Sequence, residues 1–392
     1  MTHKPDPVCG PLQGLTVIDF SRVLAGPFAT VLLADLGARV IKIEPPTGDD
    51  YRHIGPFTGD DSMLFAFANR GKESVALDLK KPDDLEFVLR LIDHADIVVE
   101  NFRPGVAHKL GIGADALMTR NNRLIYASIS GFGQNGPMRE RPAYDIIVQA
   151  LTGLMSITGD PDGAPTMVGE AFGDLTAGLY ASWAILAGLH QRERTGRGCH
   201  IDLAMFDALL SMMPTATCRY ITTGQVPQRV GNRHPLSAPF GAFRTGDGHV
   251  VVAVLNEKLF EQFCGVIGRP DLLADPRFKS DSERTANEAA LRTAFEQWST
   301  ARSTQDAVAA LSAAGVPAAA IDDVGTAVDS DHIRIRSMFR PATLNGATMR
   351  VPEQPAIFST MPRGATTQVP KLNQDADDVR TWLDQKGKST GD

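Results

Sequence analysis

The amino-acid sequence predicts an α/β protein, with one large domain built on a mostly parallel sheet and a second, smaller α+β domain. Two observations predict this fold class. Residues 15–129 alternate short apolar runs with helical stretches, which is typical of parallel sheets covered by helices on both faces. The chain also has 392 residues, which exceeds one ordinary domain and leaves enough length for a second.

Strands are expected where short apolar runs lie between turn residues. The first run, 15–20, is bounded by a glycine and a serine, and its length suits a buried strand. A helix is expected over 28–36, with Pro27 near its start and Gly37 where a C-terminal cap belongs. Similar patterns predict a helix over 82–94 and strands over 40–43, 74–79, 97–100 and 124–129. Ligands of such sheets gather beyond the carboxyl ends of the strands.

The second half of the chain has a different pattern and predicts a separate small domain. Long helices are expected over 174–191 and 203–220, the second interrupted by Pro214. An α+β unit is predicted by a strand over 248–255 and helices over 259–266, 283–299 and 304–314, and a final helix by 375–385. We expect the large domain to comprise residues 1–200, the small domain 225–325, and a linker that returns to the large domain 326–392.

The composition predicts an enzyme that acts on small molecules. Hydrophobic residues make up 43% and charged residues 22%, which is ordinary for a globular protein. The 39 Lys and Arg against 46 Asp and Glu give a net charge of −7, which disfavours nucleic acid and acidic membranes as partners. The N-terminus shows no apolar signal segment, and the apolar stretch 177–189 is too short to span a bilayer. We therefore expect a cytoplasmic protein with no nucleic-acid or membrane partner.

No pattern points to a metal or a redox cofactor. The nine histidines show no ligand spacing, and a GxGxxA stretch at 111–116 follows a helical stretch rather than a strand. The sequence contains neither GxSxG nor HExxH, so hydrolases of these classes and NAD enzymes are disfavoured. The cysteines have no CxxC spacing, which disfavours a zinc site or a disulfide framework: Cys9, Cys199, Cys218 and Cys264.

Several short segments keep a common order along nearly the whole chain. The first is PLQGLTVIDFSRVLAGPFATVLLADLGARVIKIEPP at 11–46. The others are NRGK at 69–72, LDLK at 77–80, VENFRPG at 99–105, SGFG at 130–133, YD at 144–145, GDLTAG at 173–178 and RTGRG at 194–198. As an ordered set they resemble the class III CoA-transferases, the family of formyl-CoA transferase, carnitine CoA-transferase and α-methylacyl-CoA racemase.

The resemblance implies a fold, a reaction and partners. It implies a large Rossmann-like domain, a small domain and long linkers, with two ring-like subunits interlocked as a homodimer. It also implies that the substrates are an acyl-CoA and a carboxylic acid. Coenzyme A would then be needed as part of the substrate, and no metal would be needed.

Asp174 matches the family's catalytic aspartate. From the residues alone, Asp174 follows Gly173 at the start of an apolar helix, where Asp is a preferred N-cap. On that basis a structural role and a functional one both stay open. The resemblance implies a covalent nucleophile that forms a mixed anhydride and then an aspartyl-CoA thioester. A helix N-terminus would favour the ionised carboxylate that this chemistry needs.

CoA binding is implied for a set of residues at strand ends and helix starts. CoA offers a flat adenine and phosphate groups, so its site needs apolar walls, backbone donors and cations. Lys80, Arg103 and Lys109 could supply the charge, although spacing alone would allow ordinary loop residues. The full set is Leu24, Ala25, Leu77, Asp78, Leu79, Lys80, Asn101, Phe102, Arg103, Lys109, Tyr144 and Asp145.

Tyr144 separates two activities within the family. The related racemases carry histidine at this position, because moving an α-proton needs a second acid or base opposite the aspartate. Tyrosine therefore favours transfer over racemisation. Two alternatives stay open: an α-methylacyl-CoA racemase that uses Asp174 as a base, and a non-catalytic CoA-binding subunit, which the intact Asp174 disfavours.

The substrate branch is suggested by residues 22–30. Formyl-CoA transferases carry glutamine at the Leu24 position and a polyglycine loop, and this chain has neither. Residues 22–30 instead resemble the branch that uses succinyl-CoA and dicarboxylates such as glutarate or itaconate. We expect a succinyl-CoA-like donor and a dicarboxylate acceptor, with Arg22, Arg229 and His234 as candidates to hold the distal carboxylate. Residues 131–137 are a candidate loop to close over the intermediate.

Overall fold

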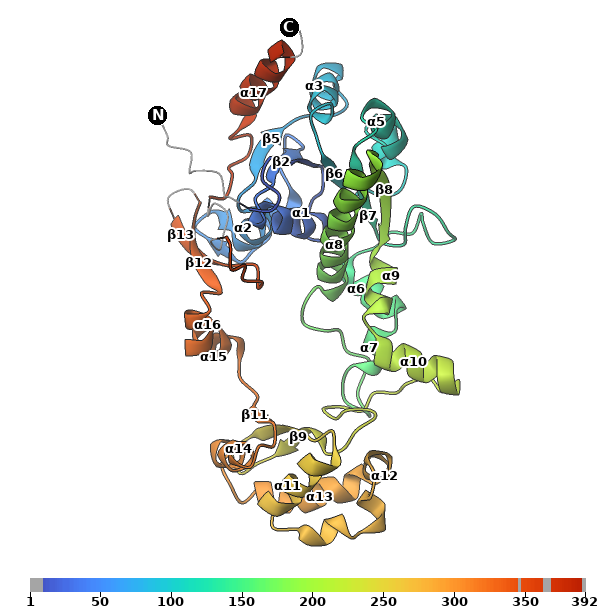
Figure 1. The fold of residues 1–392 in the computed structure, drawn as a ribbon, viewed down its shortest axis with the longest axis vertical. Coiled ribbons are helices and arrows are strands. Elements are labelled where there is room, and N and C mark those ends of the chain that lie inside the picture. Colours follow the sequence, from blue (N-terminus) through green and yellow to red (C-terminus); the bar gives the residue numbers. More distant parts are fainter. Residues whose placement is uncertain (1–9, 345–346, 362–367, 390–392) are drawn as a thin grey trace. The chain divides into compact units, whose positions relative to one another are not determined.

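The computed structural model describes residues 10–344, 347–361 and 368–389. These residues divide into two compact units (Figure 1). Unit 1 comprises residues 10–154, 167–224 and 332–389, and unit 2 comprises residues 155–166 and 225–331. The boundaries expected from the sequence assigned 155–166 to the large domain, whereas in the structure this short segment groups with unit 2.

Unit 1 is built on a six-stranded sheet in the order β5-β2-β1-β6-β7-β8. All neighbouring strands run parallel, which confirms the predicted sheet. Alternate residues of the strands face two separate cores: Val17 packs into one and Ile18 into the other, as expected for a sheet covered on both faces. The strands are β1 (Thr16–Asp19), β2 (Arg39–Glu44), β5 (Glu73–Ala76), β6 (Ile97–Glu100), β7 (Ile125–Ser130) and β8 (Cys199–Ala204).

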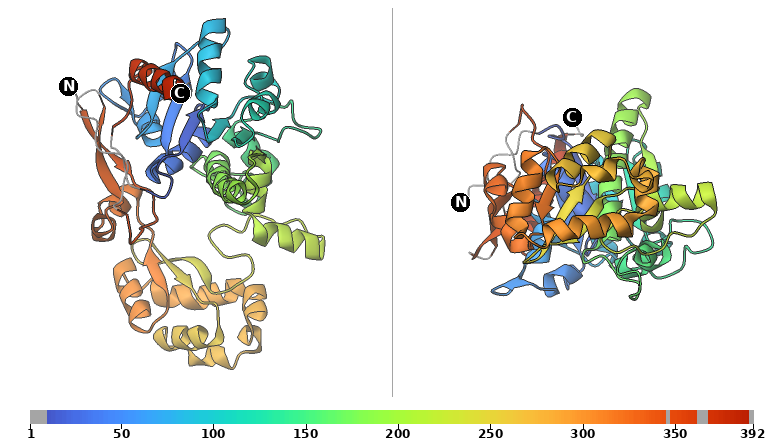
Figure 2. Two further views of the ribbon diagram at one scale, coloured as in Figure 1. Left: turned by 45° about the horizontal axis from the view of Figure 1, so that its top comes forward. Right: turned by 90° about the horizontal axis from the view of Figure 1, so that it is seen from below.

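Helices cover both faces of this sheet. One core joins it to α1 (Ala25–Asp35), α8 (Phe172–Thr195) and α9 (Met205–Ser211). The other joins it to α3 (Pro82–Ile92), α5 (Ala114–Arg120) and α17 (Ala376–Ser389). Helix α17, coloured red in Figures 1 and 2, thus brings the C-terminal segment back to the sheet beside β5. The second core of unit 1 is therefore completed by the last segment of the chain.

The helix predicted over 203–220 is wrong. This stretch contains the end of β8, then α9, then α10 (Pro214–Thr223), and Pro214 begins α10 rather than interrupting a longer helix. Strand β8 lies at the edge of the sheet, where His200 and Asp202 alternate with partly buried apolar residues. Edge strands of this kind do not give the continuous apolar run that predicted the inner strands.

The remaining elements of unit 1 surround the sheet. An antiparallel pair, β12 (Phe339–Leu344) and β13 (Ala347–Pro352), packs on α2 (Met63–Asn69) through an apolar cluster that includes Phe65, Leu344 and Met349. The others are η1 (Asp50–His53), β3 (Phe57–Thr58), β4 (Asp61–Ser62), α4 (Val106–Lys109), α6 (Asp145–Leu151) and α16 (Asp331–Ile335), with α7 (Leu154–Ile157) where the units meet in the chain.

Unit 2 combines a three-stranded antiparallel sheet with helices. Its strands, in the order β11-β10-β9, are β9 (Phe240–Arg244), β10 (His249–Ala253) and β11 (Ala318–Ala320). Phe243 and Phe263 both pack against Phe295 in its core, the first edge-on and the second with a tilted ring. The helix predicted over 283–299 is two helices, because α12 ends at Ala286 and Asn287 separates it from α13. The helices are α11 (Glu257–Val266), η2 (Pro270–Leu273), η3 (Pro276–Phe278), α12 (Asp281–Ala286), α13 (Glu288–Ser299), α14 (Thr304–Ala313) and α15 (Val324–Asp329).

Two further features concern the described residues alone. None of their helices is long and apolar enough to cross a bilayer. Cys199, Cys218 and Cys264 are free thiols, and Cys9 lies outside the described residues.

Candidate active site

A cavity of about 190 Å³ in unit 1 gathers half of the predicted site residues. It lies where the loops after β1, β6 and β7 meet the first turns of α1 and α8, which is the carboxyl edge of a parallel sheet. The predicted residues that line it are Arg22, Leu24, Ala25, Asn101, Phe102, Arg103, Tyr144 and Asp174. Residues the sequence did not single out for the site also line it: Val23, Asp50, Arg139, Arg141, Ala143 and Met205.

Asp174 lies in the first turn of α8, and its expected role as N-cap is wrong. The helix begins at Phe172 and its N-cap is Ala171, so Asp174 is the third helical residue. Asp174 therefore does not cap the helix, and it lines the cavity instead. The helix starts early because Gly173 donates its N–H to Asp145 Oδ1 at 2.6 Å, and this bond satisfies one of the first unpaired donors of the helix.

The environment of Asp174 opposes its ionisation. Burial, together with the negative charge of Asp145, raises the pKa of Asp174 to about 7. The sequence predicted that the helix N-terminus would favour the charged form, but burial outweighs that effect here. Burial and the charge of Asp174 also raise the pKa of Tyr51 to about 12, so Tyr51 stays a neutral phenol within electrostatic reach of the aspartate. A carboxylate titrating near neutrality in a cavity is typical of a reacting group.

The predicted CoA-binding loop is tied to the loop after β1. Asn101 accepts a hydrogen bond from the Arg22 N–H at 2.9 Å and donates to the Arg22 carbonyl at 2.8 Å. Glu100, which sequence reasoning missed, accepts from the Phe102 N–H at 2.8 Å. Burial raises the pKa of Glu100 to about 7. The 101–103 segment is therefore fixed at two points, by the bonds between Asn101 and the Arg22 backbone and by the Glu100 carboxylate.

A second cavity, of about 400 Å³, lies at the ends of β1, β2 and β5. It brings together the predicted stretch Leu77–Lys80 with Phe102, and it shares Arg22 and Phe102 with the first cavity. Its walls combine apolar side chains with cations, as a nucleotide needs. Lys109, the last residue of α4, lines neither cavity, so its predicted role in binding CoA stays a prediction.

A buried ionic network lies beside this second cavity. Asp19 pairs with Lys72 at 3.0 Å and accepts hydrogen bonds from Thr30 and Ser21. Although burial alone would raise the pKa of Asp19, the charges of Lys72 and Lys42 lower it to about 2. The network holds the end of β1 in place, directly before the loop that lines both cavities.

Arg139 and Arg141 are the clearest omissions of the sequence analysis. They stand shortly before Tyr144 in a charged run, Arg139-Glu140-Arg141, and this run next to a recognised segment was the available signal. With Arg22 and Arg103 they give the cavity four guanidinium groups. Two of these are weakly paired at the surface, Arg22 with Asp50 at 3.6 Å and Arg139 with Glu140 at 3.0 Å.

The other predicted substrate residues belong to unit 2. The Arg229 guanidinium donates to the carbonyls of Asp160 and Gly163, at 3.1 and 2.7 Å. The His234 ring stacks on Phe240 with centroids 4.8 Å apart. Both side chains thus have partners inside unit 2, and their part in substrate binding stays a prediction.

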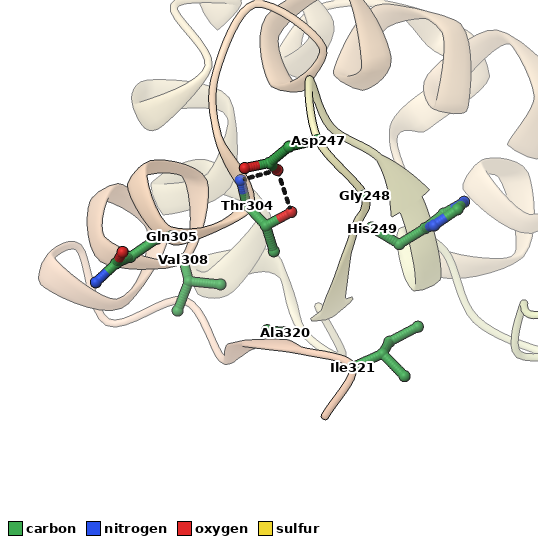
Figure 3. Close-up of a pocket in the computed structure, with 8 residues that line it drawn as sticks. All are labelled: Asp247, Gly248, His249, Thr304, Gln305, Val308, Ala320 and Ile321. Carbon is green, nitrogen blue, oxygen red and sulfur yellow. Dashed lines mark hydrogen bonds between the residues drawn. The ribbon is translucent and has the colours of Figure 1, made fainter. Parts of the chain in front are cut away.

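Unit 2 has a groove of its own, of about 720 Å³, drawn in Figure 3. Among its lining residues the one carboxylate is Asp247, which accepts hydrogen bonds from the Thr304 N–H and hydroxyl, each at 2.7 Å. These bonds lower the pKa of Asp247 and fasten the start of α14 (Figure 3). Asp247 is therefore a structural acid, unlike Asp174. In the described part of the chain, no group of His, Cys, Asp and Glu could hold a metal ion.

Fold and site together describe an α/β protein that holds a carboxylate with a raised pKa in a cavity lined by arginines, at the carboxyl edge of its sheet. The chain belongs to CoA-transferase family III, whose model matches residues 12–376. It is therefore a CoA-transferase, and members of the family act on CoA thioesters.

Relatives and solved structures agree with this assignment. An acetyl-CoA:oxalate CoA-transferase of Acetobacter aceti is 47% identical over 331 residues, which cover 84% of this chain and 85% of the relative. A succinyl-CoA:mesaconate CoA-transferase of Haloarcula marismortui is 38% identical over 394 residues, 97% of this chain and 98% of the relative. A crystal structure of a CaiB/BaiF family protein from Brucella suis, 37% identical, superposes with a TM-score of 0.84 over 95% of this chain and 99% of that chain.

Proposed function

We propose that this enzyme moves CoA from a short acyl-CoA, of the succinyl-CoA type, to a free dicarboxylic acid through a covalent intermediate on Asp174. The observation that carries this proposal is the cavity itself. Asp174 shares it with four arginines, so a nucleophile and carboxylate-binding groups lie together. Arginine suits planar carboxylates because its fork donates two parallel hydrogen bonds.

The proposed reaction is a sequence of acyl exchanges. The ionised Asp174 attacks the donor thioester carbonyl, and the CoA thiolate leaves, which gives a mixed anhydride. The thiolate then attacks the aspartyl carbonyl, expels the donor acid and leaves an aspartyl-CoA thioester. The acceptor carboxylate attacks this thioester, and the thiolate leaves and attacks the acceptor carbonyl of the new anhydride. The acceptor departs as its CoA thioester and Asp174 returns as a carboxylate.

The backbone at the start of α1 can stabilise the tetrahedral intermediates. Ala25 lines the cavity with Asp174, and the first N–H groups of a helix have no partner within it. Donors of this kind match the oxygen that becomes negative in the transition state. The anhydride must also be kept from water, and Gly131 of the predicted closing loop 131–137 lines the same cavity.

The dicarboxylate assignment is supported by charge and by the relatives. Arg22, Arg139 and Arg141 are exposed to the cavity and can hold a second carboxylate away from the reacting one. Oxalate and mesaconate, in the names of the two relatives above, are both dicarboxylates. One of those relatives is named for acetyl-CoA, so acetyl-CoA is the alternative to succinyl-CoA as donor.

A transfer assay with a panel of acids tests the proposal. Succinyl-CoA and acetyl-CoA are each offered with oxalate, mesaconate, glutarate, itaconate and matched monocarboxylates, and new CoA thioesters are detected by mass. We expect dicarboxylates to be converted at least about tenfold faster than monocarboxylates, since paired Arg–carboxylate bonds are strong. Replacement of Arg141 by Met should remove most of this preference, whereas Arg120→Met, at a surface pair with Asp93, should keep it.

Two outcomes contradict the proposal. If no acid in the panel becomes a thioester, the assignment to dicarboxylates fails. If deuterium from the solvent enters the α-carbon of a 2-methylacyl-CoA without any acceptor acid, the enzyme is a racemase instead. Hydroxylamine trapping of an acyl group on Asp174 tests the covalent intermediate separately.

We also propose that the enzyme works as a homodimer, and the surface of α8 supports this. One side of α8 is buried against the sheet, yet Leu179, Trp183 and Leu186 on its other side are exposed, Trp183 by 66%. A helix that is apolar all round is usually buried. Light scattering should give a dimer mass for the native enzyme and a monomer for Trp183→Glu. A native monomer would contradict the proposal.

A further inference from the structure

The backbone of Val23 adopts a conformation that its side chain disfavours. Its φ is +67°, in the left-handed region, where a β-branched residue is a steric outlier. Such outliers persist only where surrounding groups hold them, and they cluster at functional sites. Val23 lines the same cavity as Asp174, so the strained residue lies beside the reacting carboxylate.

Asp49 holds this conformation from the loop after β2. Its Oδ1 accepts hydrogen bonds from the N–H groups of Val23 and Tyr51, at 3.0 and 2.9 Å. Its Oδ2 pairs with Lys42 Nζ at 2.8 Å, and that ammonium donates to the carbonyl of Ser21 at 2.7 Å. Asp49 is 1% exposed and Lys42 is 0% exposed, so water does not weaken these bonds. Asp49 thus bridges the loop after β2 to the Val23 N–H directly and to the Ser21 carbonyl through Lys42.

Val23 sets the direction in which α1 begins. The helix starts at Ala25, two residues later, and its N-cap Leu24 makes no side-chain capping bond. The N–H groups of Ala25 and Gly26 are the first of the helix and point out of its end. A Cβ atom on Gly26 would lie 2.2 Å from the Cβ of Ser21. The turn around Val23 is therefore folded back tightly on the end of β1.

The first residue of α1 also packs tightly against α8, close to Asp174. A Cβ atom on Gly178 would lie 2.6 Å from the carbonyl oxygen of Ala25. Gly178 is one helical turn beyond Asp174, on the same face of α8. Because the two backbones meet at Gly178, a small change in the course of residues 22–25 moves the first N–H groups of α1 relative to the Asp174 carboxylate.

We propose that Asp49 is a positioning residue for CoA transfer, which holds Val23 in its left-handed conformation and so aims the N–H groups of Ala25 and Gly26 at the carbonyl that reacts on Asp174. The proposal rests on the proposed function, since that carbonyl belongs to the Asp174 intermediate. Asp49 borders the second cavity but is only 1% exposed, so we expect it to act through the backbone rather than through contact with substrate. Its removal should therefore slow the chemical steps and leave the binding of the CoA thioester nearly unchanged.

A double-mutant cycle tests this proposal, with Asp49→Ala, Val23→Gly and the double variant. We expect Asp49→Ala to lower kcat about 100-fold, the loss typical of a misplaced oxyanion donor, with KM for the acyl-CoA changed by less than about threefold. Val23→Gly alone should cost about threefold, because glycine also admits other conformations. In the Val23→Gly background, loss of Asp49 should cost only about tenfold, because glycine adopts the left-handed conformation without a steric penalty.

Asp35→Ala is the matched control. Asp35 is as buried as Asp49 and pairs with a cation, Arg70, at 2.5 Å, but it lines neither cavity. Its loss should lower the thermal unfolding temperature and leave kcat unchanged. The proposal is overturned if Asp49→Ala keeps the kcat of the control, or if loss of Asp49 costs as much in the Val23→Gly background as in the native enzyme. Should Asp49→Ala not fold, a folded and active double variant supports the proposal and an inactive one overturns it. A wild-type enzyme that transfers CoA to no acid contradicts the proposed function instead.

Discussion

Asp19 and Asp174 are two carboxylates of unit 1 that lie in opposite environments. Asp19, at the end of β1, is fully buried and is surrounded by donors from Lys72, Thr30 and Ser21. Asp174, in the first turn of α8, forms no ion pair among the described residues and faces the negative charge of Asp145. As a result the pKa of Asp19 falls to about 2, while that of Asp174 rises to about 7.

The difference shows how the same residue type serves structure or chemistry. A buried carboxylate that is fully paired stays ionised and holds neighbouring segments together. A partly buried carboxylate left without a cation, such as Asp174, is destabilised as an anion, so bond formation to a carbonyl carbon, which removes the charge, relieves this cost. The arginines near Asp174 line the cavity rather than pair with it, so they remain available to the substrate.

The largest effect is expected when Asp174 loses its charge. Asp174→Asn should lower the transfer rate by about 10⁴-fold or more, since the nucleophile is gone. A suitable control is Asp207→Asn, because Asp207 is an exposed acid in the first turn of α9 and lines neither cavity. Acyl-CoA turnover measured by mass spectrometry checks this. A rate near the wild-type value in Asp174→Asn would show that the two aspartates do not differ in chemistry.

Replacing each aspartate by Asn should change the stability in opposite directions. Asp19→Asn leaves Lys72 buried without its partner, so the free energy of unfolding should fall by about 3 kcal/mol. Asp174→Asn removes a charge whose burial is unfavourable, so the free energy of unfolding at about pH 8 should rise by about 2 kcal/mol. Urea unfolding monitored by circular dichroism measures both.

The two stability effects also depend on pH with opposite sign. The pKa of Asp19 is lowered in the folded state, so its contribution is present above about pH 4 and is lost as the pH falls toward 2. The pKa of Asp174 is raised, so its cost appears as the pH rises from about 4 through 7. The gain in Asp174→Asn should therefore shrink at about pH 5. A gain of equal size at both pH values would contradict the raised pKa.

A smaller effect is expected at Asp145. Asp145→Asn removes the negative charge beside Asp174 but keeps an oxygen for the Gly173 N–H. The pKa of Asp174 should then fall, and the acid limb of the pH profile of kcat/KM should move to lower pH. Glu170→Gln is the matched control, since Glu170 influences Tyr51 but not Asp174. An unchanged limb in Asp145→Asn would mean that burial alone sets the pKa.

The smallest effect is expected at Glu100. At about pH 8 the Glu100 carboxylate accepts a charge-assisted hydrogen bond from the Phe102 N–H, and Glu100→Gln should raise KM for the acyl-CoA about threefold. At about pH 6 the side chain is largely protonated, so the variant and the native enzyme should agree. Glu288→Gln in unit 2 serves as the control. An equal change in KM at both pH values would indicate a purely steric role.

The inner strands could be predicted because short apolar runs make up most of each. The sheet buries both faces of β1, β2, β6 and β7, so apolar residues dominate them, although β2 also carries the buried Lys42. Strand β8 escaped prediction because its edge position lets His200 and Asp202 stay exposed. The start of α8 was misplaced because the capping preference of Asp is a local signal, and the bond from Gly173 to Asp145 is not local.

The site could be predicted where its residues stand in recognisable segments. Asp174 and Tyr144 were found this way, and so was the segment 101–103. Arg139 and Arg141 were missed, because exposed arginines are common, the charged run beside Tyr144 is a weak signal, and only the fold makes these two part of a cavity lining. Nor does the sequence show that Asp49 holds Val23, since a positive φ at a valine contradicts its local preference.

The sequence by itself determined the parallel sheet and the family, and it singled out Asp174 as the proposed nucleophile, because these depend on the order of residues along the chain. Only the tertiary structure decided that Asp19 is an ionised anchor and Asp174 an acid near neutrality. The reason is physical: burial and Coulomb interactions depend on distances in space, and the groups that set each pKa come from distant parts of the chain. Lys72 stands 53 residues from Asp19, and Asp145 reaches the turn of Asp174 through a bond that spans 28 residues.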